Sequence, residues 1–214
     1  MKSSISQRLE SLDVLRGFDL LLLVGLESVM HHLSEAINTP SFHSFMWCFS
    51  HVSWEGFSTW DLVMPLFMFM SGITIPFALS RYKQEANKVL VYKRILKRVV
   101  LLWIFGMMCQ GNLLALNPER IYFYSNTLQT IAVGYLISAL LFLHTSIKTQ
   151  VILAIAMLLG FWGAMELITI QGYGGGNYTP DGNLAEWIDR TILGRFRDGA
   201  SVVNGEVQFP DWYR

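Results

Sequence analysis

Five apolar stretches, each close to the length of a membrane-spanning helix, constrain the fold of this chain most. A span needs about 20 predominantly apolar residues, and a helix satisfies all its backbone hydrogen bonds inside a bilayer. We therefore predict an all-α, polytopic transmembrane helical bundle over residues 1–169. The predicted spans are 14–36, 59–80, 96–116, 128–145 and 150–169.

The composition agrees with a membrane location. Hydrophobic residues make up 52% of the chain and charged residues 15%, whereas soluble domains carry about 25% charged residues. The formal net charge of zero argues against a nucleic-acid partner and leaves membrane lipid as the expected surroundings. Cys48 and Cys109 lack the spacing of metal ligands, so we predict two buried small apolar residues and no metal site.

Lysine and arginine are distributed unevenly between the loops. The segment 37–58 has none, whereas the segment 81–98 carries seven. The positive-inside rule then places the amino terminus in the cytoplasm and residues 37–58 outside, in the inner (plasma) membrane if the protein is bacterial. No small-residue cleavage site follows the first apolar stretch, so no removable signal peptide is expected. The basic residues are Arg81, Lys83, Lys88, Lys93, Arg94, Lys97 and Arg98.

Residues 170–214 are more polar and are predicted to form an extracytoplasmic loop. We predict that its glycine run, residues 172–176, forms a flexible linker. Asn183 and Glu186 then have the spacing of a helix cap, which predicts a short amphipathic helix. Because the chain stops in polar sequence after an odd number of spans, we expect it to be part of a longer membrane protein. The apolar residues at helical spacing are Leu184, Trp187, Ile188 and Ile192.

The most informative polar residues are His51 and Asp61, where a polar loop meets the second apolar stretch. Histidine titrates near neutral pH, so His51 is a candidate nucleophile or general base, with Asp61 beside it. Alternatively, His51 is an interfacial histidine in an aromatic belt. Asp61, three residues after Ser58, equally suits a helix cap.

Two charged residues of the first predicted span are further candidates. Glu27 lies about 16 Å along the helix from Arg16, well inside the bilayer, where carboxylates usually face a bundle interior or a wet cavity. It lines a substrate or proton path, or forms an internal ion pair. Asp13 and Asp19 lie one turn from Arg16 on either side and can pair with it.

The remaining candidates are binding residues. The basic run at Lys93, Arg94, Lys97 and Arg98 is either the positive-inside signature or a phosphate-binding patch for a phosphorylated donor. The amides of Asn126 and Gln129, beside aromatic residues, suit a sugar or a headgroup, and suit helix capping equally well. The predicted substrate-binding residues are Trp54, Glu55, Asn126 and Gln129.

Several ordered stretches of the chain resemble motifs of one known family. Residues 8–17 (RLESLDVLRG) resemble the opening motif of the heparan-alpha-glucosaminide N-acetyltransferase family and its bacterial DUF5009-like homologues. Three later stretches are similar to further parts of the family's pattern, so the resemblance covers nearly the whole chain. These are residues 51–72, 128–135 and 183–194.

The resemblance implies a transmembrane acyltransferase that passes acetyl from cytosolic acetyl-CoA to a glucosamine-type amine on the far side. The family's catalytic histidine matches His51, and its aspartate matches Asp61 at the same interval. Arg16 and the basic run of residues 93–98 would then bind acetyl-CoA. Two departures stand out: the family has an asparagine where this chain has Glu27, and about twice as many spans.

Two other functions fit the same sequence. An amino-sugar permease or transport-associated protein would use intramembrane carboxylates to move protons or a solute. An inactive structural fragment is the third possibility, and a homo-oligomer is compatible with all three.

Overall fold

The computed structural model describes residues 10–37, 39–85, 87–109, 111–115, 121–124, 127–197, 200–203 and 206–209, apart from the side chains of residues 23, 24, 27, 28, 31, 201 and 203. The protein is mostly helical, at 74%. It divides into two compact units, residues 1–73 and 74–214. Helix α4 (Val63–Lys83) contributes residues to both units.

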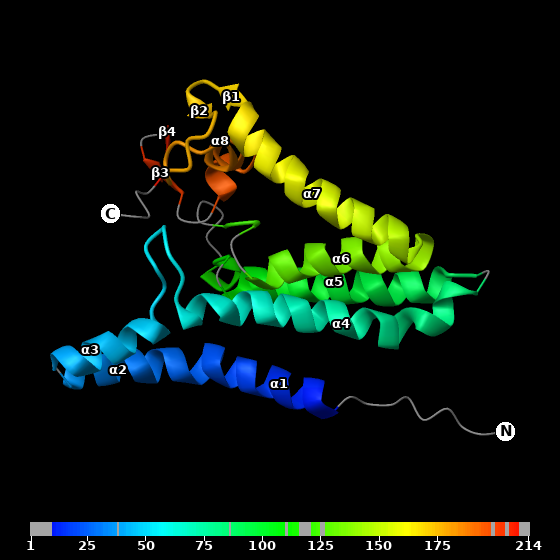
Figure 1. Cartoon of the computed structure of the whole chain (residues 1–214), viewed down its shortest axis with the longest axis horizontal. Helices are drawn as coiled ribbons and strands as arrows, with labels where there is room; N and C mark the ends of the chain where they lie inside the picture. Colours follow the sequence, from blue (N-terminus) through cyan, green and yellow to red (C-terminus); the bar gives the residue numbers. More distant parts are fainter. Residues whose placement is uncertain are drawn as a thin grey trace. The chain divides into compact units, whose positions relative to one another are not determined.

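The amino-terminal unit starts with a helical rod that contains one π-helical turn (Figure 1, blue). Helix α1 (Glu10–Leu21) continues directly into the π-helix η1 (Leu22–Leu26) and then into α2 (Glu27–Ala36). Because the three segments follow one another without a break, no cap is needed between them. Single π-helical turns inside helices occur frequently at functional sites.

A chain of aromatic rings joins the short helices that follow. Phe45 lies 5.5 Å from Phe49, and Phe49 lies 6.0 Å from the buried Trp60, measured between ring centroids. Aromatic pairs at this separation pack favourably, so they hold the two ends of the intervening loop together. The elements are α3 (Pro40–Met46), η2 (Trp47–Phe49) and η3 (Thr59–Leu62), which leads into α4.

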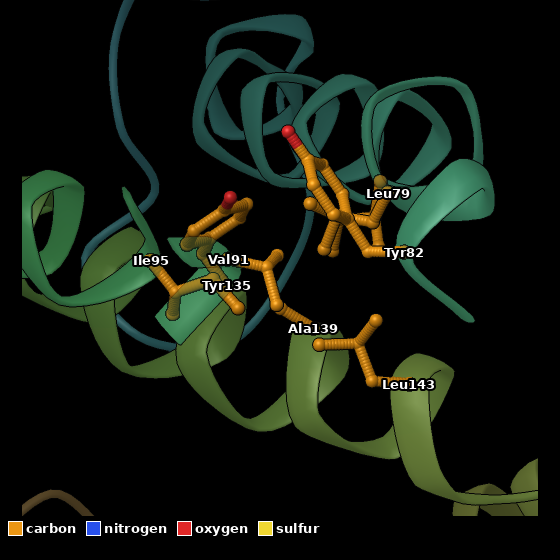
Figure 2. Close-up of a cluster of buried hydrophobic side chains, with 8 residues drawn as sticks. Leu79, Tyr82, Val91, Ile95, Tyr135, Ala139 and Leu143 are labelled. Carbon is orange, nitrogen blue, oxygen red and sulfur yellow. The ribbon is translucent and has the colours of Figure 1, made fainter. Parts of the chain in front are cut away.

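The carboxyl-terminal unit is built on helices α5 (Val89–Cys109) and α6 (Thr127–His144), which lie side by side (Figure 1, green). Helix α7 (Ile147–Leu167) diverges from this pair. Buried side chains from the end of α4, from α5 and from α6 form one apolar cluster (Figure 2), which is the core of this unit. Its members are Ile75, Leu79, Tyr82, Val91, Ile95, Tyr135, Ala139 and Leu143.

Among the described residues, three helical segments are long and apolar enough to cross a membrane: Thr59–Lys83, Thr127–His144 and Ile147–Leu167. They correspond to the second, fourth and fifth predicted spans. The first and third predicted spans are not confirmed. The first predicted span lies in the continuous rod of α1, η1 and α2, which carries several charged residues, and the first half of α5 carries four basic residues.

The predicted third span extends too far at its carboxyl end. Helix α5 ends at Cys109, and Asn112 then adopts a positive φ of 54°, which no continuous helix contains. A short 3₁₀ turn, η4 (Leu113–Ala115), follows. Cys109 is exposed and Cys48 half-buried, so the prediction that both are buried is wrong.

Two small antiparallel hairpins lie outside the all-α prediction. Strand β1 (Thr169–Ile170) pairs with β2 (Tyr173–Gly174) across a turn whose two central residues both have positive φ, as expected for the tight type I′ turn. At Gly174 (φ 83°) a Cβ atom would lie 2.3 Å from the carbonyl oxygen of Ile168. The glycine run therefore builds an ordered hairpin, and the prediction of a flexible linker is wrong. The second hairpin pairs β3 (Ser201–Val203) with β4 (Glu206–Gln208).

The predicted short helix of the tail is present as α8 (Leu184–Ile192). Its amino terminus is capped as expected, because Oδ1 of Asn183 accepts a hydrogen bond from the main-chain N–H of Glu186 at 2.8 Å. Its buried face differs from the predicted apolar stripe. Leu184 and Glu186 are buried, whereas Ile192 is exposed. A 3₁₀ turn, η6 (Gly194–Phe196), follows the helix.

Candidate active site

His51 stands at the start of a loop whose ends are tied together. The loop, residues 50–58, connects η2 to η3 (Figure 1, cyan). The hydroxyl of Ser58 lies 2.6 Å from the main-chain oxygen of Ser50 and donates a hydrogen bond to it. Gly56 has a φ of 123°, which side-chain-bearing residues rarely adopt. His51 therefore follows directly after a fixed point of the chain.

Asp61 is held by the first turn of η3. The main-chain N–H of Ser58 donates to Oδ2 of Asp61 at 2.8 Å, which is the aspartate half of a capping box. The Ser58 hydroxyl also lies 3.0 Å from the same oxygen. Since that hydroxyl has one proton, its shorter contact with Ser50 takes precedence. The predicted capping role of Asp61 is thus confirmed, and it leaves Oδ1 available for another partner.

That partner is His51. Its Nδ1 atom lies 2.7 Å from Oδ1 of Asp61. A carboxylate only accepts hydrogen bonds, so Nδ1 carries the proton and Nε2 of the neutral ring carries the lone pair. The His51 side chain is 64% exposed and that of Asp61 is 23% exposed. A ring oriented in this way by a carboxylate can act at Nε2 as a base or a nucleophile.

Two predicted substrate-binding residues lie on the same loop. Trp54 and Glu55 are both exposed, and so is the neighbouring Phe57. An exposed aromatic side chain and a carboxylate near the imidazole suit the stacking and hydrogen bonding that a sugar requires. The structure thus brings His51, Asp61, Trp54 and Glu55 into one local segment of the amino-terminal unit.

The candidates of the first helix are placed only in part. Glu27 begins α2 in the same unit as His51, but its side chain lies outside the described part of the structure. Nη1 of Arg16 lies 4.0 Å from Oδ1 of Asp13, so one predicted pair is present. The second predicted pair, between Arg16 and Asp19, does not form in the described part of the structure. The carboxylate of Asp19 is buried and accepts no hydrogen bond from the described residues.

The four basic candidates lie on α5, in the carboxyl-terminal unit, whereas His51 belongs to the amino-terminal one. Lys93 and Lys97 are exposed. The guanidinium carbon of Arg94 lies 5.7 Å from the ring centroid of Tyr82. A phosphate group is therefore most accessible to the two lysines and to Arg94.

Gln129 lies in the first turn of α6. Gln129 is fully buried, and its Nε2 donates a hydrogen bond to the main-chain oxygen of Phe123 at 2.6 Å. This contact ties the segment before α6 to the helix, but it is not a helix cap, because the amide donates and the start of a helix needs an acceptor for its N–H groups. Asn126 lies outside the described residues.

Sequence reasoning missed the second task of Ser58. Its spacing from Asp61 indicated a cap, but not that the same serine closes the His51 loop through Ser50. It also missed the pairing of buried Glu186 with Arg190 and Arg197. The i,i+4 spacing of Glu186 and Arg190 could have indicated their pair, whereas no sequence signal joins Glu186 to Arg197, which comes from beyond the helix. Among the residues that the structure describes, no group of three potential metal ligands occurs.

Together, the long apolar helices indicate a membrane protein, and the polar loop at the start of one of them carries a histidine–aspartate pair. Residues 8–181 match the family described as Domain of unknown function (DUF5009). The match covers well over half of the chain, so the protein belongs to this family. No curated protein matches the chain.

Proposed function

We propose that this protein is an integral membrane acetyltransferase that moves acetyl from acetyl-CoA to the amine of an amino sugar. The observation that carries the proposal is the 2.7 Å contact between Asp61 and Nδ1 of the exposed His51. It prepares Nε2 for proton or acyl transfer. The resemblance of residues 8–17 and 51–72 to the heparan-alpha-glucosaminide N-acetyltransferase family supports the choice of donor and acceptor.

In one route, Nε2 of His51 attacks the thioester carbonyl carbon. The carbon–sulfur bond breaks, and its electron pair leaves with the CoA thiolate. Asp61 offsets the positive charge of the acetyl-imidazolium. The sugar amine then attacks the acetyl carbon, the bond to Nε2 breaks, and the proton of the new ammonium centre passes to the thiolate. The products are an N-acetyl sugar and CoA.

In the other route, Nε2 of His51 removes a proton from the sugar amine while that amine attacks the thioester directly. The imidazolium formed is stabilised by Asp61 and returns the proton to the CoA thiolate. Both routes give the same products. They differ in whether an acetyl group is bonded to His51 at any stage.

Acetyl-CoA and the sugar require different binding groups on the chain. Acetyl-CoA carries phosphates that arginine and lysine bind well, and the exposed Lys93 and Lys97 with Arg94 offer such groups on α5. The sugar would contact Trp54 and Glu55 beside the imidazole. We propose a cytosolic donor and an extracytoplasmic acceptor, which the uneven distribution of lysine and arginine between the loops supports.

The test is acetyl transfer from radiolabelled acetyl-CoA to glucosamine by the purified protein in lipid nanodiscs. We expect activity in the wild type and none in His51→Ala. His43→Ala is the matched control, because it removes another exposed imidazole from the same unit. Equal turnover in the wild type and His51→Ala would rule out both routes.

A quench experiment distinguishes the routes. Brief exposure to labelled acetyl-CoA without acceptor, followed by proteolysis and mass spectrometry, should find acetyl on the peptide containing His51 if the covalent route holds. Turnover with an unlabelled His51 peptide would favour the base route. Uptake of labelled glucosamine into proteoliposomes without acetylation, unchanged in His51→Ala, would instead support a permease.

A further inference from the structure

Two positively charged side chains lie close together where α4 ends and α5 begins. Two guanidinium groups share the ring of Tyr82: their Cζ atoms lie 4.6 Å (Arg81) and 5.7 Å (Arg94) from its centroid. Nη2 of Arg81 also donates to the Tyr82 hydroxyl at 2.5 Å. The ring itself is buried in the apolar cluster (Figure 2). Both cations are therefore anchored to a fixed part of the core.

These two cations have no anionic partner among the residues that the structure describes. Neither Arg81 nor Arg94 forms an ion pair with any carboxylate in the described part of the chain. Glu85 is the one acidic residue in the sequence from residue 74 to 98. Because both groups lie over one ring, their Cζ atoms are no more than about 10 Å apart, close enough to repel each other through weakly screened space. An anion between them would remove that repulsion.

The surroundings of the two arginines indicate what the anion belongs to. Apolar side chains are exposed on both helices beside them, Phe77 on α4 and Leu96, Val100 and Leu101 on α5. This is the pattern of helices whose apolar surface meets acyl chains and whose ends reach the headgroups. Arginine side chains at such a level extend their charge toward phosphate while their stems cover apolar surface.

We propose that Arg81 and Arg94, over Tyr82, form a binding site for the phosphodiester of an anionic membrane phospholipid. The guanidinium fork matches two phosphate oxygens, and the adjacent exposed apolar side chains accept the acyl chains. A soluble phosphate ester would bind the guanidinium groups but would leave the exposed apolar side chains uncovered. The proposal does not rest on acetyl transfer: it assigns Arg94 to the lipid, and the exposed Lys93 and Lys97 remain for the phosphates of acetyl-CoA.

The experiment measures lipid retention. The protein is reconstituted in nanodiscs of phosphatidylcholine with phosphatidylglycerol, extracted into mild detergent, and the co-purifying lipids are quantified by mass spectrometry. We expect phosphatidylglycerol to be enriched about tenfold over its share of the bilayer, and the double variant Arg81→Gln/Arg94→Gln to lose that enrichment. Lys148→Gln, which removes an exposed positive charge from α7, should keep it.

Two further arms identify the source of the phosphate and guard against misfolding. Excess inorganic phosphate or CoA should leave the retained phosphatidylglycerol in place, and Arg81→Lys/Arg94→Lys should recover part of the enrichment because it restores the charge. Equal retention of both lipids by the wild type overturns the proposal. So does displacement of the lipid by CoA, or an equal loss in Lys148→Gln.

Discussion

Asp61 uses its two carboxylate oxygens for different tasks: Oδ2 accepts from the main-chain N–H of Ser58 at 2.8 Å, and Oδ1 lies 2.7 Å from Nδ1 of His51. One side chain thus caps the first turn of η3 and orients the imidazole. The capping interpretation of Asp61 is confirmed, and the contact with His51 has the geometry that the proposed catalytic role requires. Substitutions here must therefore be chosen to separate folding from chemistry.

Asp61→Asn provides this separation. An asparagine oxygen can still accept from Ser58, so the cap and the thermal stability should change little. Its NH₂ group would then face Nδ1 as a donor and move the imidazole proton to Nε2. Because the lone pair is lost from Nε2, we expect acetyl transfer to fall by about 10³-fold or more. Turnover of acetyl-CoA with glucosamine checks this.

The control for Asp61→Asn is Glu55→Gln, which neutralises an exposed carboxylate on the same loop. It should leave the catalytic rate constant close to that of the wild type and alter KM for the sugar at most. Near-normal turnover in Asp61→Asn would show that the contact with His51 has no part in the reaction.

Ser58→Ala tests whether the closed loop matters. The serine is 1% exposed, and its hydroxyl donates to Ser50 at 2.6 Å. Removing it leaves a carbonyl oxygen without this donor, and we expect a loss of about 1–2 kcal/mol in stability. Acetyl transfer should fall less than in Asp61→Asn, because the Ser58 N–H still holds the carboxylate. Thermal unfolding and turnover are measured together, with the exposed Ser53→Ala as control. A variant as stable as wild type would show that the loop is closed by other contacts.

Gly56→Ala probes the backbone of the same loop. A Cβ atom at this position would lie 3.5 Å from Cγ1 of Val52, which is ordinary contact. The penalty therefore comes from the φ of 123°, and we expect about 1–3 kcal/mol of destabilisation. Gly17→Ala in α1 is the control, since nothing lies within 4 Å of its added methyl group and alanine favours helix. Unfolding in nanodiscs followed by tryptophan fluorescence provides the measurement. If both variants have the same free energy of unfolding, the loop does not depend on this glycine.

The second, fourth and fifth predicted spans agree closely with the structure because apolar length is a local property. Thr127–His144 and Ile147–Leu167 can be recognised by counting. The end of α5 at Cys109 could not be predicted in this way, because apolar residues continue past the turn at Asn112. Local hydropathy reports burial or lipid contact and not where the backbone turns.

The candidate site was predictable to the extent that its residues are close in sequence. His51, Ser58 and Asp61 lie within one short segment, and the capping spacing of Ser58 and Asp61 is a reliable local signal. Gln129 shows the opposite case. Its burial and its bond to Phe123 depend on how the segment before α6 folds back, which side-chain chemistry alone does not reveal.

Glu186→Gln tests the contact that holds the tail together. Glu186 is 9% exposed, and accepts from Nε of Arg190 at 2.6 Å and from Nη2 of Arg197 at 2.5 Å. The neutral amide leaves the guanidinium group of Arg197 without this charge partner and leaves Arg190 with only the longer contact to Asp181 at 3.9 Å, so we expect a loss of about 3 kcal/mol. Glu206→Gln, at an exposed position of β4, should leave the stability unchanged. Protease resistance of the tail and thermal unfolding report the effect. Unchanged protection in Glu186→Gln would mean that the ion pairs do not stabilise α8.

Alkaline pH should release the contact between the tail and α7. The hydroxyl of Tyr178 donates to Oε2 of Glu166 at 2.7 Å, and this hydrogen bond raises the pKa of Tyr178 above its ordinary value. Since the folded protein holds this proton more tightly, the contact contributes fully below the ordinary tyrosine pKa of about 10 and is lost as pH rises through the higher folded value. Difference absorbance of the phenolate, wild type minus Tyr178→Phe, should therefore show a late titration step. Glu166→Gln removes the acceptor charge and should return that step to the ordinary range. A Tyr178 step already at the ordinary value in the wild type would show that the hydrogen bond does not form.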